Sequence, residues 1–418
     1  IAIGYQAAQE NTTGTRIIAI GANAYDASDT ENDNIAIGYD AMTTNTAGGQ
    51  HNIAIGSYAL DALTSGDANI SIGNFSMGAC DAGSSNVAIG YRALDANTSG
   101  TKNVAMGYDA LGETTTGDGN VGIGYGALLG NTTADNNVAV GRVALTANTT
   151  GADNVAMGYA ALATQTTAGG NTAIGNLALN ANTSGASNTS VGSQSLMANT
   201  TAASCTAVGF AALTANTTGT LNTAIGHSAL VACTTGTHNT AIGTSVLDAL
   251  TTGVDNIGIG YGVGGHDVAM DTGLKNVLIG NYCDVSATDS TNQIVMGFNA
   301  SGNANNSFVF GNGGTDSAIS FGATSISAPS DIRLKQNIND DVAGLSFIND
   351  LRPVTYEWRK EKDIPEEMLT HKAGSEERYN NDFINHGFIA QEVKEVIDNH
   401  PEIKDGFKMW SEDERDGR

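Results

Sequence analysis

A short pattern of apolar and polar positions recurs along most of the chain with a 17-residue period. In one unit, Val87-Ala88-Ile89 shows the alternation of a β-strand, and Gly90 then ends the strand because glycine readily adopts a positive φ. A second apolar pair, Ala93-Leu94, follows. The polar segment 97–100 turns the chain back through side chains that can bond to their own backbone. Each unit therefore predicts one strand and one return loop.

The repeat is nearly invariant in length. Its glycine recurs from Gly21 to Gly297 in 17-residue steps, with one step of 18 after Gly38 and one of 20 after Gly260. A βαβ unit needs about 30 residues and a two-helix repeat about 34, so one turn of a parallel β-solenoid remains. At about 4.8 Å per turn, some 18 turns predict a rod roughly 85 Å long.

Two positions in the repeat predict how the turns stack. The asparagine that precedes each strand would form a ladder of side-chain amides, interrupted at Cys205 and resumed afterwards. The residue between the two large aliphatics is nearly always small, as in Ala88, and both strand faces are apolar. We expect Val and Ile to fill each coil and the small residues to close contacts between chains, because an apolar stripe of this length exceeds what monomers expose. A homotrimer is the favoured assembly.

Composition divides the chain near residue 329. All prolines and tryptophans lie at or after Pro329, and the residues before Ser330 carry 5 basic and 22 acidic side chains, against 13 and 21 afterwards. Neither part offers the basic patch that nucleic acid requires, and no apolar run reaches the roughly 20 residues that span a membrane. We expect three regions: a solenoid shaft over 1–291, a Phe/Gly-rich neck and cap over 292–329, and a small α+β domain over 330–418.

Other side chains in the repeats give weaker indications of chemistry. The four cysteines lack paired or metal-type spacing and are interpreted as small buried hydrophobes, and the histidines are scattered, so we expect no metal or cofactor. Acidic residues in the turn corners lack calcium-loop spacing and are interpreted as solvated charge. A tyrosine follows the repeat glycine in several turns; packing is favoured over stacking on sugar rings. These tyrosines are Tyr39, Tyr91, Tyr108, Tyr125, Tyr159 and Tyr261.

The repeats resemble the head repeats of trimeric autotransporter adhesins and the shafts of phage tail fibres, over roughly residues 1 to 300. After them come three stretches, 330–338 (SDIRLKQNI), 351–358 (LRPVTYEW) and 387–393 (GFIAQEV). In this order they resemble the self-cleaving intramolecular chaperone of phage endosialidases and tail fibres, a Ser/Lys peptidase family. The resemblance implies a domain that templates trimer formation and then cuts itself from the fibre.

The resemblance also implies site residues. Ser330 matches the nucleophile, Lys335 matches its base, and the scissile bond is Pro329–Ser330. A serine hydroxyl needs such a base, and a lysine with a lowered pKa can serve as one. The alternative is that Ser330 caps a helix and Lys335 is a surface charge. The family continues into a further segment and a long helix, whereas this chain ends at Arg418, so we expect a truncated module whose cleavage is in question.

The functional prediction is a virion structural fibre, extracellular in location, that joins other tail proteins and contacts a host-cell receptor, with a glycan as one candidate. Any enzymatic activity would be a single self-cleavage. The alternative is a cellular surface adhesin of the trimeric autotransporter kind, which would end in a membrane anchor. An enzyme acting on polysaccharide is disfavoured, because the acidic residues of the rod fall in turn corners rather than in a paired catalytic cleft.

Overall fold

A computed structural model describes residues 1–28, 30–44, 48–313, 316–321, 345–365, 371–378 and 384–400. The chain divides into two compact units, Ile1–Pro329 and Ser330–Arg418, and each is considered by itself. The predicted sites Pro329, Ser330 and Lys335 lie outside the described residues.

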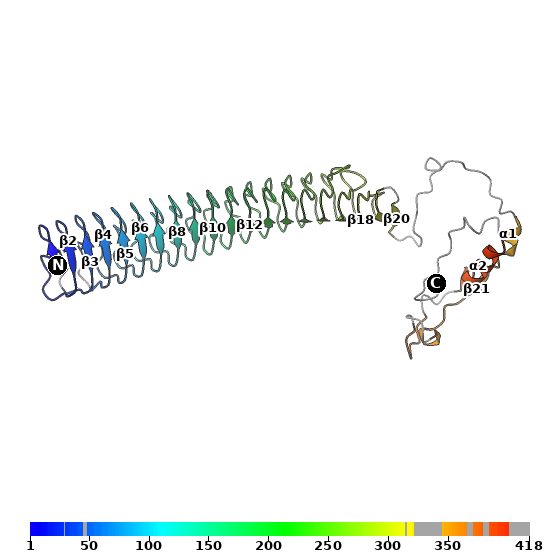
Figure 1. Cartoon of the computed structure of the whole chain (residues 1–418), viewed down its shortest axis with the longest axis horizontal. Helices are drawn as coiled ribbons and strands as arrows, with labels where there is room; N and C mark the ends of the chain where they lie inside the picture. Colours follow the sequence, from blue (N-terminus) through cyan, green and yellow to red (C-terminus); the bar gives the residue numbers. More distant parts are fainter. Residues whose placement is uncertain are drawn as a thin grey trace. The chain divides into compact units, whose positions relative to one another are not determined.

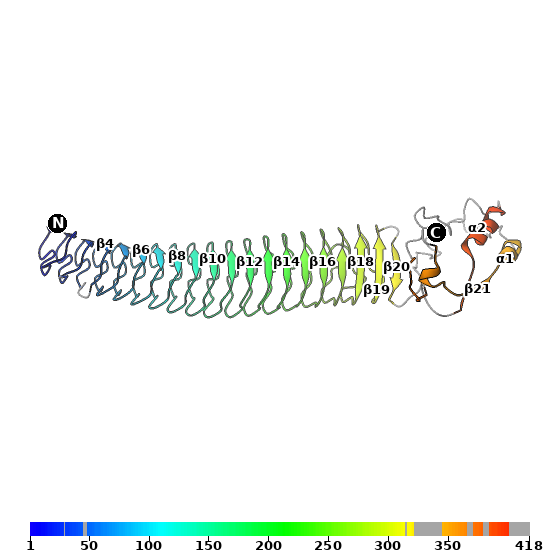
Figure 2. The ribbon, with the colours of Figure 1, turned by 90° about the horizontal axis from the view of Figure 1, so that it is seen from below.

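The first unit is a parallel β-solenoid, as the repeat period predicts. Each coil contributes one short strand, and successive strands pair in parallel to form a single sheet along the rod (Figures 1 and 2). The strands are β1 (Ala2–Ile3), β2 (Ile18–Ile20), β3 (Ile35–Ile37), β4 (Ile53–Ile55), β5 (Ile70–Ile72), β6 (Val87–Ile89), β7 (Val104–Met106), β8 (Val121–Ile123), β9 (Val138–Val140), β10 (Val155–Met157), β11 (Thr172–Ile174), β12 (Thr189–Val191), β13 (Thr206–Val208), β14 (Thr223–Ile225), β15 (Thr240–Ile242), β16 (Ile257–Ile259), β17 (Val277–Ile279), β18 (Gln293–Gly297), β19 (Ser307–Gly311) and β20 (Ser317–Ser320).

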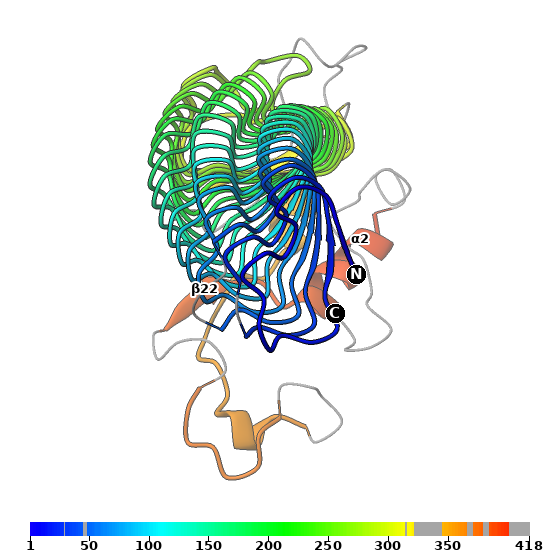
Figure 3. The ribbon, with the colours of Figure 1, turned by 90° about the vertical axis from the view of Figure 1, so that its left-hand side faces the viewer.

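The register places equivalent residues directly above one another. Ala88 aligns with Ala105, for example, and Gly90 stacks on Gly107. Viewed along the rod, the coils are fanned out, each rotated relative to the one before it, from the first coils (blue) to the later ones (green) (Figure 3). The last pairing differs, because β20 runs antiparallel to β19 and ends the parallel series.

The repeat glycine is required by geometry. Gly90 has a φ of +141°, and a Cβ there would lie 2.4 Å from the carbonyl oxygen of Gly107 in the next coil. Non-glycine residues also adopt positive φ in every coil, as Arg92 (52°) and Leu94 (55°) do. These left-handed residues bend the return loop sharply enough to close so short a coil.

The predicted assignment of the two strand faces is wrong. Ala88 is completely buried inside the coil, whereas Val87 and Ile89 on either side of it point outward and are partly exposed. The reason is the leucine of the return loop, which fills the interior: a Cβ added at Gly122 would lie 3.1 Å from Cγ of Leu111. The strand must therefore present its small residue inward, and the large aliphatics form an outward face along the rod.

Two ladders of buried asparagines run along the rod inside the coils, from each coil to the next. In the predicted ladder, Asn120 donates its backbone N–H to Oδ1 of Asn103 (2.9 Å) and its side-chain Nδ2–H to the carbonyl of Ala134 (2.8 Å). Cys205 interrupts this ladder, as the sequence indicates. The second ladder lies in the return loop, where Asn148 donates to Oδ1 of Asn131 (3.0 Å). The sequence pattern had indicated only a turn for this asparagine.

The second unit contains a small α+β region. Its described elements are α1 (Leu345–Asp350), β21 (Val354–Tyr356), the 3-10 helix η2 (Glu361–Asp363), β22 (Asn385–Gly387) and α2 (Ala390–Asp398). Strands β21 and β22 pair in antiparallel fashion. Phe347 and Ile397 form a small core between the helices, with Leu351, Val393 and Val396 packed against it.

Candidate functional site

The second unit joins two of the three stretches that carry the chaperone resemblance. Residues 351–358 contain β21, and residues 387–393 run from the end of β22 into α2. The strands align Val354 with Gly387 and Tyr356 with Asn385. The third stretch, 330–338, which holds Ser330 and Lys335, lies outside the described residues, so the catalytic assignment stays a prediction.

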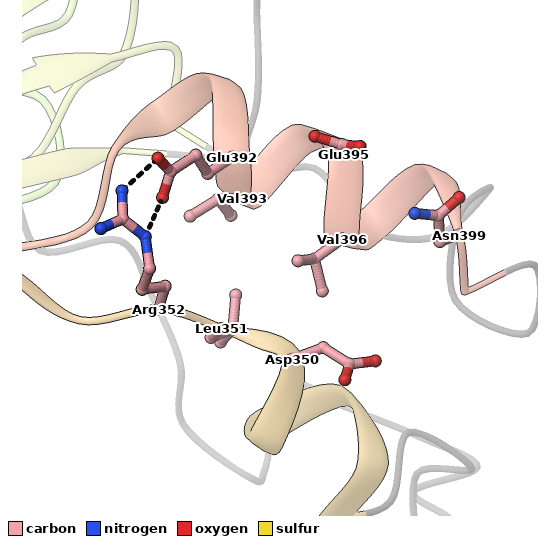
Figure 4. A pocket seen from close by; sticks show the side chains of 8 residues that line it. All are labelled: Asp350, Leu351, Arg352, Glu392, Val393, Glu395, Val396 and Asn399. Carbon is pink, nitrogen blue, oxygen red and sulfur yellow. Dashed lines mark hydrogen bonds and ion pairs between the residues drawn. The ribbon is translucent and has the colours of Figure 1, made fainter.

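An ion pair ties the same two stretches together (Figure 4). The Arg352 guanidinium faces the Glu392 carboxylate in a two-point contact, with Nε donating to Oε2 at 2.9 Å and a second N–H donating to Oε1. These hydrogen bonds lower the pKa of Glu392 below its ordinary value. Such bidentate geometry orients both groups as well as attracting them. Sequence reasoning missed this pair, although the opposite charges in the two family-like stretches were a usable signal.

A cavity of about 270 Å³ lies beside this ion pair. Its apolar wall is Leu351, Val393 and Val396, and its polar rim includes Glu395 and Asn399 (Figure 4). Its residues come from the end of α1, the turn that follows α1, and α2 with the residue after it, so the cavity lies where α1 packs against α2.

Further polar contacts order the loop between β21 and β22. Glu361 is nearly buried and accepts hydrogen bonds from Lys372 Nζ and Ser375 Oγ, each at 2.8 Å. These contacts lower its pKa. Glu376 lies between Lys360 and Lys362, and their hydrogen bonds lower its pKa to about 2. Lysines thus favour the ionised form of Glu361 and of Glu376, which suits a structural role for these two carboxylates.

The aromatic side chains on the rod form a stack along its axis. Tyr91, Tyr108 and Tyr125 lie with ring centroids 5.1 and 5.3 Å apart and nearly parallel planes, and the Arg142 guanidinium covers Tyr125 and Tyr159. Each of these rings thus has a neighbouring ring stacked against it. Sugar rings stack on open aromatic faces, so this arrangement favours packing, as the sequence pattern did.

The acidic turn corners bond to the backbone as well as to solvent. Asp118 accepts the N–H of Thr101 through Oδ1, and Asp135 accepts that of Asp118. One cluster, His266, Asp267 and Asp284, has potential metal-ligand atoms within 4.8 Å of one another. Asp284, however, accepts three backbone N–H groups of the inserted loop, from residues 266, 267 and 268. This explains the buried carboxylate as a cap for the loop.

The strands carry an apolar surface along the rod, the outward face, which we define as the first and third residues of each strand from β2 to β17. None of these residues is charged. Ile123 and Met157, for example, are 37% and 40% exposed. With strands about 4.8 Å apart, the face is roughly 80 Å long and 7 Å wide, or on the order of 500 Å², at the upper end of what monomers show.

Comparison with known proteins gives one match. Residues 330–400 match a family model described as the chaperone of endosialidase. No curated protein and no solved structure is significantly similar to the chain. None of the helices in the described ranges is long and apolar enough to cross a membrane. The chain thus combines a long parallel β-solenoid with a C-terminal region that is similar to endosialidase chaperones.

Proposed function

We propose that this chain is the shaft of a phage tail fibre, a homotrimer assembled by its C-terminal chaperone and used in host attachment. The observation that carries the proposal is the family match over 330–400, directly after a solenoid with an apolar face along its length. A rod provides reach and an attachment surface, whereas the chaperone match accounts for how such a rod is assembled.

The outward face supports association with copies of the same chain. It is continuous and repeats at the spacing of the strands. A partner that covers it from end to end must share both its length and its repeat, and a second copy of the chain does so. Burying its Val, Ile and Met side chains stabilises association by about 25 cal/mol per Å² removed from water. Three copies can bury the face around a common axis.

A C-terminal chaperone solves a problem that this rod creates. Because all coils share one repeat unit, chains displaced by one coil still place apolar residues against apolar residues. Pairing between chains is also non-local and therefore slow to find. Aligning the chains at one end lets the coils add in order. Cleavage afterwards removes the aligned end, so that disassembly is limited by a kinetic barrier.

The proposed cleavage uses Ser330 and Lys335. The Ser330 hydroxyl transfers its proton to the neutral Lys335 amine and attacks the carbonyl carbon of Pro329. The resulting tetrahedral intermediate breaks its bond to the Ser330 nitrogen, which takes the proton from the Lys335 ammonium and leaves as an amine, and water then hydrolyses the ester that remains. The products are a carboxylate at Pro329 and a free amino group at Ser330.

Trimer formation is tested by placing a charge on the outward face. Ile123→Glu should reduce the trimer fraction in light scattering, because a carboxylate would be buried between chains without a partner. The matched control is Thr116→Glu, which adds the same side chain at an exposed turn corner of the preceding coil. If light scattering shows that the parent protein is a stable monomer, the proposed homotrimer is refuted.

Cleavage is tested separately by mass spectrometry. Ser330→Ala and Lys335→Ala should each prevent the cut between residues 329 and 330, while trimer formation survives, because templating depends on the fold of the module. Arg333→Ala is the control, since it alters charge nearby without removing a proposed catalytic group. Cleavage of Lys335→Ala at the rate of the parent would exclude this mechanism.

A further inference from the structure

Five consecutive coils carry threonine on the otherwise aliphatic outward face. The first strand residue is Val or Ile in β2–β10, becomes threonine in β11–β15, and returns to Ile and Val in β16 and β17. The register stacks these threonines in one column. We define them as the threonine block: Thr172, Thr189, Thr206, Thr223 and Thr240.

The structure shows no hydrogen-bonding role for the hydroxyls of the threonine block within a single chain. Its side chains are half-buried on the outward face, and their hydroxyls make no hydrogen bond to any described residue. Threonines elsewhere differ: Thr132 Oγ1 donates to the carbonyl of Thr149 in the next coil at 3.0 Å. The third strand residues beside the block, such as Ile174 and Val208, stay aliphatic, so the change is confined to one column.

We propose that the threonine block sets the axial register of the chains, with its hydroxyls pairing between copies at the interface. This inference rests on the proposed trimer. In register, threonine lies beside threonine, and each hydroxyl can donate and accept. A displacement of one coil instead places one threonine at the level of Val155 and another at the level of Ile257, and each hydroxyl is buried without a partner.

The position of the block makes the effect directional. Each further coil of displacement, up to the length of the block, adds a mismatched level at both ends, so larger slips are disfavoured more strongly. The block also lies off-centre on the outward face, which runs from β2 to β17. Reversing one chain end for end would place the five threonines against the valines and isoleucines of β4–β8, which disfavours antiparallel association. The column therefore specifies both register and direction.

The test substitutes all five threonines of the block in the full chain with valine, which has nearly the same shape. Single cysteines report the register between chains. One chain carries Ile123→Cys, another carries Val140→Cys, and the two are co-expressed and then oxidised. These sites are aligned in adjacent coils and lie outside the block. Cross-links between like positions report correct register, and cross-links between positions 123 and 140 report a slip of one coil.

In the parent, like-position cross-links should dominate. The five-valine variant should raise the 123-to-140 fraction roughly ten-fold or more, since a slip no longer leaves hydroxyls unpaired. The matched control replaces five exposed turn-corner threonines with valine and should leave the ratio unchanged; they are Thr116, Thr133, Thr150, Thr201 and Thr218. An unchanged ratio in the five-valine variant would overturn the inference. A monomeric parent without cross-links would instead refute the proposed trimer.

A second variant covers the case in which five valines disturb folding. Val155→Thr combined with Thr240→Val moves the block by one coil and keeps its length. This chain should form trimers by itself as well as the parent does. When it is co-expressed with a tagged parent, mixed trimers should fall well below the statistical proportion. Statistical mixing would overturn the inference.

Discussion

Two glycines in one coil offer a sharp test of how the coils stack. Gly124 ends strand β8 with a φ of +131°, and a Cβ there would lie 2.6 Å from the carbonyl oxygen of Gly141 in the next coil. Gly126 follows two residues later with a φ of +61°, and its Cβ would meet only Val143 Cγ1 at 3.7 Å. The same substitution to alanine therefore probes a blocked and an open position.

We expect Gly124→Ala to cost about 4 kcal/mol at this coil interface. A non-glycine residue in such a backbone conformation costs roughly 1–3 kcal/mol, and forcing a methyl group against a rigid carbonyl costs about 1–3 kcal/mol more. Gly126→Ala should cost only about 1–2 kcal/mol, which is the ordinary cost of placing an L residue in the left-handed region, because no neighbouring atom blocks the added methyl group. The equivalent residues in the neighbouring coils, Asp109 and Val143, already adopt it with φ of 51° and 52°.

Hydrogen exchange resolves the effect locally, which matters because a repeat protein need not unfold in one step. The amide of Gly141 donates to the carbonyl of Ile123 at 2.8 Å and reports on the affected interface. A loss of about 4 kcal/mol should speed its exchange by roughly three orders of magnitude in Gly124→Ala, against about ten-fold in Gly126→Ala. Equal acceleration in both variants would refute the argument that close backbone approach requires the repeat glycine.

Three further predictions concern side chains in the rod. Burial raises the pKa of Asp61 to about 6, with Asp95 and Asp40 contributing, so the ionised form opposes folding and stability is gained as pH falls through 6. Asp61→Asn should stabilise by about 1 kcal/mol at pH 8, after allowance for partial solvation, and by little at pH 4, as measured by denaturant unfolding; Asp153→Asn, at an exposed turn corner, is the control for the loss of one surface charge. Cys205→Asn should raise stability by about 1 kcal/mol in the same assay, because it restores an amide oxygen to the ladder; a loss of stability would count against the ladder. Burial raises the pKa of Cys80 and of Cys233 to about 11, so an alkylating reagent at pH 8 should label neither before unfolding, and labelling of the native protein would contradict their placement.

The sequence predicts the coil but not which way its strand faces. A fixed 17-residue period excludes other repeat folds, and the asparagine before each strand predicts the ladder that the structure contains. The strand faces could not be inferred from residue size alone, because Val87, Ala88 and Ile89 are all apolar. The answer depends on Leu94 in the return loop, which is buried in the interior and leaves room for a small residue. That is a three-dimensional packing constraint.

The C-terminal region was predictable in a different way. Its three stretches indicate the family, and the match over 330–400 agrees with them. Spacing along the chain could not pair Arg352 with Glu392, which are 40 residues apart and meet through the pairing of β21 with β22. Nor does spacing bring Ser330 and Lys335 together, since five residues place their side chains on different sides of a strand or a helix.

The direction of the hydrogen bonds in the rod has a mechanical consequence. The strand pairings and the asparagine ladders connect each coil to the next, so they lie along the long axis. Under tension between the two ends of the rod, the hydrogen bonds within one coil-to-coil interface share the load. The successive interfaces, however, act in series, so each of them carries the whole load. Tensile strength is then set by the weakest interface, and lengthening the rod adds reach without adding strength. Bending would instead stretch one side of many interfaces slightly, which makes the same structure stiff against sideways forces.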